Sequence, residues 1–94
     1  MSFAVREIQP TPNPNALKFV LDQTIEEAPA SFFSAEAARD HPIASKLFAI
    51  EGVNSVLMLG DFVTINKRAE TKWKPLTDRV KRVLAEATKS SGKT

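Results

Sequence analysis

The sequence predicts a two-layer α+β domain with a four-stranded antiparallel sheet and two helices on one face of the sheet. Residues 3–22 and 53–66 each contain two runs in which apolar and polar residues alternate, as in strands with one buried face. Residues 42–50 and 71–89 repeat their apolar residues at helical spacing. The expected order of elements is therefore ββαββα.

The first predicted hairpin joins a strand at Phe3–Ile8 to a strand at Ala16–Asp22. Alternation along the second strand separates an apolar face from a mixed face, namely Leu17, Phe19 and Leu21 against Lys18 and Val20. Three prolines between the strands lack the N–H groups that a strand ladder needs. Residues 9–15 are therefore expected to form the connecting loop.

Residues 23–40 have the weakest pattern in the chain. Pro29 is incompatible with a helix through residues 25–30. Phe32 and Phe33 are expected to be core contacts in a short extended piece. The stretch after them fits a helical turn or a loop equally well, so no regular element is assigned here.

The first predicted helix covers residues 42–50. Pro42 suits the first helical position, and Asp40 or His41 would then act near the N-cap. Gly52 is expected to be the glycine that follows the last helical turn. The apolar residues of this helix share one face: Ile43, Leu47, Phe48 and Ile50.

The second predicted hairpin turns at Gly60-Asp61, a dipeptide typical of two-residue turns. This turn sets Leu59 opposite Phe62. The face assigned to the core then carries Val56, Met58, Val63 and Ile65, and the other face carries Leu57, Leu59 and Phe62 with Ser55, Thr64 and Asn66. Three apolar residues on a face expected to meet water are unusual, and residues 23–40 are one candidate to cover them.

The last predicted helix has an apolar stripe of Trp73, Leu76, Val80, Val83, Leu84 and Ala87. Pro75 must lie in its first turn. The opposite face carries Lys74, Asp78, Lys81, Arg82 and Lys89. We expect a single domain over residues 1–89 and a flexible tail over residues 90–94.

The residue inventory excludes several kinds of chemistry. The 94 residues include no cysteine and one histidine, so neither disulfides nor cysteine-ligated zinc or iron–sulfur clusters can form within the chain. The three glycines are isolated and form no phosphate-binding loop, and no serine lies in a nucleophile motif. We therefore expect a non-enzyme without catalytic, cofactor or metal residues. The sequence shows no signal peptide or membrane span, which predicts a cytoplasmic protein.

A small basic nucleic-acid-binding module is the alternative prediction. The net charge is +2, and cations gather on the last helix. Acidic residues dilute them, however, and no aromatic stacking platform lies between basic residues. A solvated helix face explains the pattern as well, and a small-molecule-binding domain is a third possibility.

Five blocks of the sequence occur together: TPNPNALKF at 11–19, HPIASKLF at 41–48, IEGV at 50–53, GDFVTI at 60–65 and WKPL at 73–76. In this order they resemble the N-terminal domain of the Nfu/NifU-like iron–sulfur scaffold proteins. The resemblance covers most of residues 3–84, whereas residues 23–40 contain no matching block.

The resemblance implies a role in the assembly or delivery of iron–sulfur clusters. In longer members of the family, a separate C-terminal domain carries the C-x-x-C motif that binds the cluster. This chain resembles a stand-alone N-terminal domain, and without cysteine it is not expected to be a cluster ligand. The implied role is that of a non-enzymatic accessory domain that docks a protein partner: an iron–sulfur carrier, a C-x-x-C scaffold acting in trans, or a target apoprotein.

Two surfaces are the candidate partner-binding sites. The first is the loop of Asn13, Pro14 and Asn15 with Lys18 beside it, and the second is the apolar face formed by Leu57, Leu59 and Phe62. The loop also has a purely structural interpretation, because asparagine side chains stabilise turns by bonding to nearby backbone.

Overall fold

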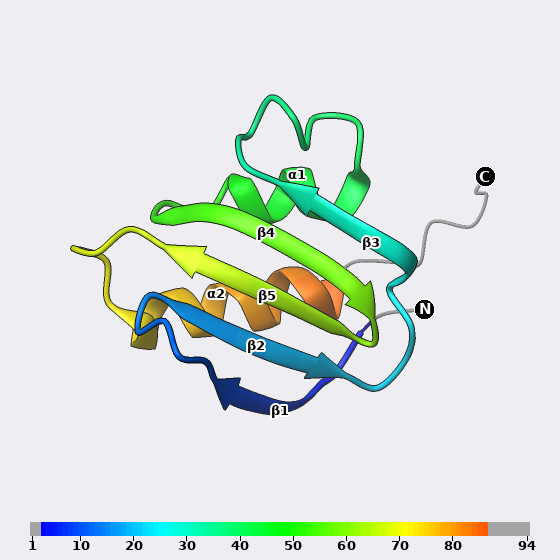
Figure 1. Cartoon of the computed structure of the whole chain (residues 1–94), viewed down its shortest axis with the longest axis horizontal. Helices are drawn as coiled ribbons and strands as arrows, with labels where there is room; N and C mark the ends of the chain where they lie inside the picture. The colour runs from blue at the N-terminus through cyan, green and yellow to red at the C-terminus, as the bar shows by residue number, and fades with distance from the viewer. Residues whose placement is uncertain (1–2, 87–94) are drawn as a thin grey trace.

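The computed structural model describes residues 3–86 as a five-stranded antiparallel sheet with two helices on one face (Figure 1). The strands are β1 (Val5–Pro10), β2 (Ala16–Leu21), β3 (Glu26–Phe32), β4 (Val53–Gly60) and β5 (Phe62–Lys67), and the helices are α1 (Pro42–Phe48) and α2 (Trp73–Glu86). The sheet order is β1-β2-β5-β4-β3. The α+β class and the antiparallel pairing are confirmed, but the predicted four strands and ββαββα order are wrong, because β3 adds a strand before α1.

The additional strand β3 pairs with β4 at one edge of the sheet. The ladder is interrupted between Glu26 and Ala30, and Pro29 lies inside this irregular stretch. A proline is tolerated there because an edge strand leaves one row of N–H groups unpaired. Pro29 therefore excluded a helix but not a strand. Since β3 lies beside β4, it does not cover the apolar face of the second hairpin.

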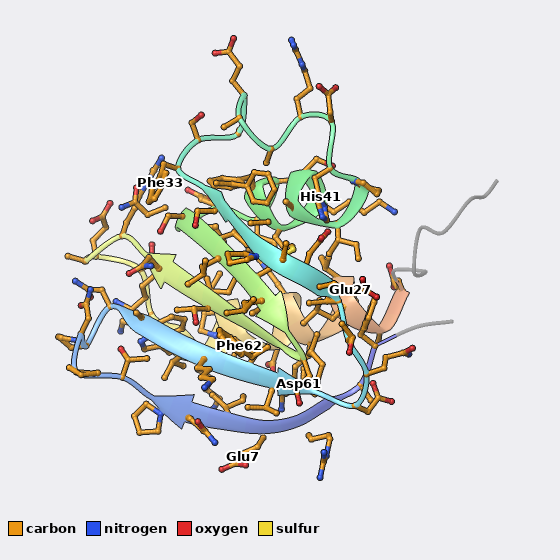
Figure 2. The ribbon with its side chains drawn as sticks, turned by 45° about the vertical axis from the view of Figure 1, so that its right-hand side comes forward. Glu7, Glu27, Phe33, His41, Asp61 and Phe62 are labelled. Atoms are coloured by element: carbon orange, nitrogen blue, oxygen red, sulfur yellow. The ribbon has the colours of Figure 1, made fainter. Side chains whose placement is uncertain are left out.

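The two adjacent phenylalanines at the end of β3 have different environments. Phe32 packs against the core and meets the His41 ring edge-on, with 5.3 Å between ring centroids. Phe33 is 77% exposed, so its predicted core contact is wrong (Figure 2). The chain then runs through turns from Ser34 to Asp40 before α1 begins.

The first strand also differs from its prediction. It continues to Pro10, beyond the predicted end at Ile8, because β1 is the other edge of the sheet and tolerates a missing N–H. An irregularity between Val5 and Glu7 shifts the alternation by one residue. As a result, Val5 and Ile8 both pack against the core, although simple alternation placed them on opposite faces.

The predicted register of the second hairpin is confirmed. Leu59 stands opposite Phe62, and Gly60 has the positive φ of 60° that the tight turn requires. The side chains assigned to the core are fully buried beneath the helices: Val56, Met58, Val63 and Ile65. They join Phe19 and Leu21 of β2 in one hydrophobic cluster.

Both helices bury the predicted faces, and α1 contacts β4 and α2. His41 is the N-cap of α1, and Pro42 follows it at the first helical position. The helix ends at Phe48, so Gly52 is not its C-terminal glycine; Gly52 lies in the turn before β4 with φ of 101°. The predicted tail at 90–94, together with Ala87 and Lys89 of the last predicted helix, lies outside the described residues.

Candidate functional site

The loop between β1 and β2 is held in shape by its own polar side chains. The Thr11 hydroxyl donates to the carbonyl oxygens of Asn13 and Ala16, at 2.9 and 3.0 Å. It also accepts a hydrogen bond from the backbone N–H of Asn13. The Asn13 side-chain oxygen accepts from the backbone N–H of Asn15 at 2.9 Å. The prolines of this loop have no backbone N–H to donate to a neighbouring strand. The hydrogen bonds of Thr11 and Asn13 stabilise the turn instead, so residues 11–16 shape it locally.

The same loop is tied to β5 and α2 by contacts between distant parts of the sequence. The Asn15 side-chain oxygen accepts a hydrogen bond from Lys67 Nζ at 3.1 Å. The indole Nε1 of Trp73 donates to the carbonyl oxygen of Pro14 at 3.1 Å. Two of the three loop residues predicted as partner contacts, Pro14 and Asn15, therefore have partners within the chain.

Lys67 is the buried charged residue of the described chain, with 8% of its surface exposed. Its ammonium group also donates to the Arg68 carbonyl at 3.3 Å and lies 5.5 Å from the centroid of the Trp73 ring. Carbonyl oxygens and an aromatic face are the groups that stabilise a cation at such a position. Helical spacing placed Trp73 on the apolar face of the last helix and no pattern singled out Lys67; nothing in the local sequence indicates that they meet the loop.

The outer surface of the loop remains available to solvent. Pro12, Asn13 and Pro14 are exposed, whereas Asn15 is half-buried. The side-chain Nδ2 of Asn13 donates to Asn66 Oδ1 at 3.4 Å, close to the limit for such a bond. The exposed surface of the loop is therefore formed by two prolines and by an Asn13 side chain that is already hydrogen-bonded within the chain.

The face of the sheet opposite the helices is the second candidate surface. Strand register places Val20 opposite Phe62, and Phe62 opposite Leu59, across three adjacent strands. We call the following five residues the open-face patch: Lys18, Val20, Leu57, Leu59 and Phe62. All five are half-buried, and the four apolar members lie outside the core cluster. The ammonium group of Lys18 lies 4.3 Å from the centroid of the Phe62 ring.

The structure divides the predicted partner-binding residues into two groups. Lys18 joins Leu57, Leu59 and Phe62 on the open face, although the sequence associated it with the loop. The loop residues directly precede the first residue of β2 and are held by Trp73 and Lys67. Val20 was the residue that sequence analysis missed; its place beside Lys18 on the mixed face of β2 was the available signal.

The side chains that the structure describes do not fit an iron–sulfur cluster or a bound metal. The sequence has no cysteine, and within residues 3–86 no three of the histidine and carboxylate side chains lie close enough to share an ion. Both ring nitrogens of His41 are engaged. Nδ1 accepts from the backbone N–H groups of Ile43 and Ala44, and Nε2 lies 2.6 Å from Glu26 Oε2.

Comparison with known proteins gives a consistent group of relatives. The family model described as "Scaffold protein Nfu/NifU N terminal" matches residues 5–91. A NifU-like protein of Schizosaccharomyces pombe is 37% identical over 92 residues, which cover 88% of this chain and 35% of that protein. The human mitochondrial NFU1 iron-sulfur cluster scaffold homolog is 43% identical over 65 residues, which cover 68% of this chain and 26% of that protein. The chain thus spans about a third or less of these relatives.

Solved structures share the fold. The solution structure of a NifU-like protein from Saccharomyces cerevisiae is 25% identical, with a TM-score of 0.75 over 88% of this chain and 77% of that one. A crystal structure of a Staphylococcus aureus protein, at 21% identity, superposes with a TM-score of 0.74 over 85% of this chain and 96% of that one. The family match over nearly all of the described residues, together with the relative from Schizosaccharomyces pombe, shows that the chain belongs to the Nfu/NifU N-terminal scaffold family.

Proposed function

We propose that this chain is a non-enzymatic interaction domain in iron–sulfur cluster assembly or delivery, and that it docks a separate C-x-x-C scaffold protein. The observation that carries the proposal is the family match over residues 5–91 in a chain without cysteine. The cluster is then the cargo of the partner, because this chain offers no thiolate to hold it.

Two features support docking as the activity. The open-face patch presents apolar side chains outside the core cluster, and their contiguity on three strands, unlike single scattered apolar residues, favours an interaction site. The loop of residues 11–15, which is held by hydrogen bonds within itself and to Trp73, presents a second surface. Neither contains the paired acids, bases or nucleophiles of a catalytic site.

The nucleic-acid alternative receives no support from the relatives, none of whose names mentions nucleic acid. On α2, exposed Lys74, Lys81 and Arg82 are accompanied by exposed Asp78, as on an ordinary solvated helix face.

Within residues 3–86, no helix is long and apolar enough to cross a bilayer. We propose the cytoplasm as the compartment; cell fractionation tests this, since the human relative is named mitochondrial.

The direct test is a binding measurement between the full chain and a purified C-x-x-C scaffold protein from the same organism. We expect saturable binding by calorimetry and faster transfer of a cluster from that scaffold to an apoprotein when the chain is present. Lys81→Glu, an exposed change on α2, controls for simple charge attraction and should bind like the wild type. Neither binding nor a change in transfer rate for the wild-type chain would refute the proposed function.

A further inference from the structure

The open-face patch has the width and the charge expected of a docking site for one helix. We propose that it binds a single amphipathic helix of the partner protein, with an apolar face on Val20, Leu57, Leu59 and Phe62 and a carboxylate above Lys18. This inference rests on the proposed function, because it names the part of the partner that docks.

The width of the apolar stripe matches a helix. Val20, Phe62 and Leu59 lie side by side on β2, β5 and β4, which are consecutive strands of the sheet. Two strand spacings amount to about 10 Å, and a helix with its side chains is about 10–12 Å wide. Leu57 extends the stripe along β4, because it stands two residues before Leu59 on the same face. One helix would therefore cover the stripe.

A helix fits this surface better than an added strand. Both edges of the sheet are irregular and contain a proline, Pro10 in β1 and Pro29 in β3. Such edges resist pairing with another strand. An extended segment laid over the face itself would turn unpaired backbone groups toward apolar side chains, which costs free energy. A helix satisfies its own backbone hydrogen bonds and can present a purely apolar stripe.

The charges around the patch indicate where the docked helix carries an acidic side chain. Lys18 lies between Gln9 and Thr64 in the strand register, and both neighbours are uncharged. Within residues 3–86, no carboxylate lies within ion-pair distance of Lys18. The Phe62 ring, 4.3 Å from this ammonium group, compensates in part for the water that a docked helix removes, and a carboxylate on the helix supplies the opposite charge that compensates for the rest. Glu7, exposed and opposite Val20 at the β1 side, disfavours a second acid on the helix end above β1.

Two synthetic helical peptides test this chemistry on the full chain. They share one leucine face and differ at a single central position, which is Glu in one and Lys in the other. With the ¹⁵N-labelled chain, we expect the Glu peptide to shift the amide resonances of Val20, Leu57 and Phe62 and to bind about three- to fivefold more tightly than the Lys peptide. Shifts confined to α2 or to the loop of residues 11–15 would overturn the inference.

Two variants sharpen the test. Lys18→Glu should reverse the preference between the peptides, because it reverses the charge and leaves the four apolar residues of the patch in place. The double change Leu57→Lys with Leu59→Lys should abolish binding of both peptides, and Lys81→Glu should change nothing. Thermal melting verifies that each variant is folded. A peptide preference that Lys18→Glu leaves unchanged would also overturn the inference.

The same variants separate this inference from the proposed function. If the wild-type chain and the Leu57/Leu59 double variant bind the C-x-x-C scaffold equally well, the scaffold does not use the open face: the inference fails and the proposed function stands. If the double variant alone loses the scaffold and the Lys81→Glu control keeps it, both are supported. If the wild-type chain binds the Glu peptide but no scaffold, the proposed function fails. The helix that docks on the open face then belongs to a protein other than a C-x-x-C scaffold.

Discussion

The indole nitrogen of Trp73 donates a hydrogen bond to the carbonyl oxygen of Pro14, joining the first turn of α2 to the proline-rich loop 59 residues earlier. Trp73→Phe keeps the apolar ring and removes the donor. We expect it to lower the free energy of unfolding by about 1 kcal/mol, measured by urea denaturation, and to speed hydrogen exchange at the Asn15 amide. Lys74→Ala, exposed on the neighbouring position, is the control. Unchanged exchange in the loop would contradict this interpretation.

Lys67 and Asn15 should be energetically coupled, because Nζ of the lysine donates to the side-chain oxygen of the asparagine. Lys67→Met keeps a long apolar stem and removes the charge. In a double-mutant cycle with Asn15→Ala, we expect a coupling of about 1 kcal/mol, measured by denaturation. Lys46→Ala, on the exposed face of α1, should combine additively with Lys67→Met. Additive effects of Lys67→Met and Asn15→Ala would contradict the contact.

His41 connects α1 to β3. Because Nδ1 accepts from two backbone N–H groups, the proton of the neutral ring lies on Nε2 and is donated to Glu26. We expect His41→Ala to cost about 2 kcal/mol by losing both the cap and this bond. His41→Asn should cost about half as much, because asparagine caps the helix but is too short to reach Glu26. Equal unfolding free energies for the two variants would contradict this division.

Gly52 and Gly60 form a matched pair, because both have positive φ but only one is crowded. A Cβ at Gly52 would lie 2.6 Å from Cγ2 and Oγ1 of Thr71, whereas nothing lies within 4 Å of one at Gly60. We expect Gly60→Ala to cost about 1–2 kcal/mol through backbone strain alone. For Gly52→Ala, crowding adds about 1–3 kcal/mol. Thermal melts compare them; equal shifts in Tm would refute the crowding.

Cluster reconstitution tests the ligand argument. The chain has no cysteine, and the described histidine and carboxylate side chains form no group of three. Anaerobic incubation of the full chain with iron and sulfide should therefore give no visible cluster absorbance after desalting. The same treatment of a C-x-x-C scaffold protein supplies the positive control. A stoichiometric cluster on this chain would show that other ligands suffice.

Local patterns in the sequence determined most of the elements. The Gly60-Asp61 turn fixed the register of the second hairpin, and alternation then assigned Met58 and Val63 to the core. The spacing of Leu76, Val80 and Leu84 defined the buried face of α2. These patterns depend on neighbours in the chain, so they could be read without the fold.

The tertiary structure decided what depends on distant partners. Glu26–Phe32 becomes a strand because β4 offers it an edge, and no local periodicity indicated that pairing. The loop of residues 11–15 was correctly placed between two strands, but its anchors on Lys67 and Trp73 come from more than fifty residues away. Likewise, four members of the open-face patch were predicted from the sequence, but Val20 was not, and the continuity of the patch across β2, β5 and β4 arises only from the strand order.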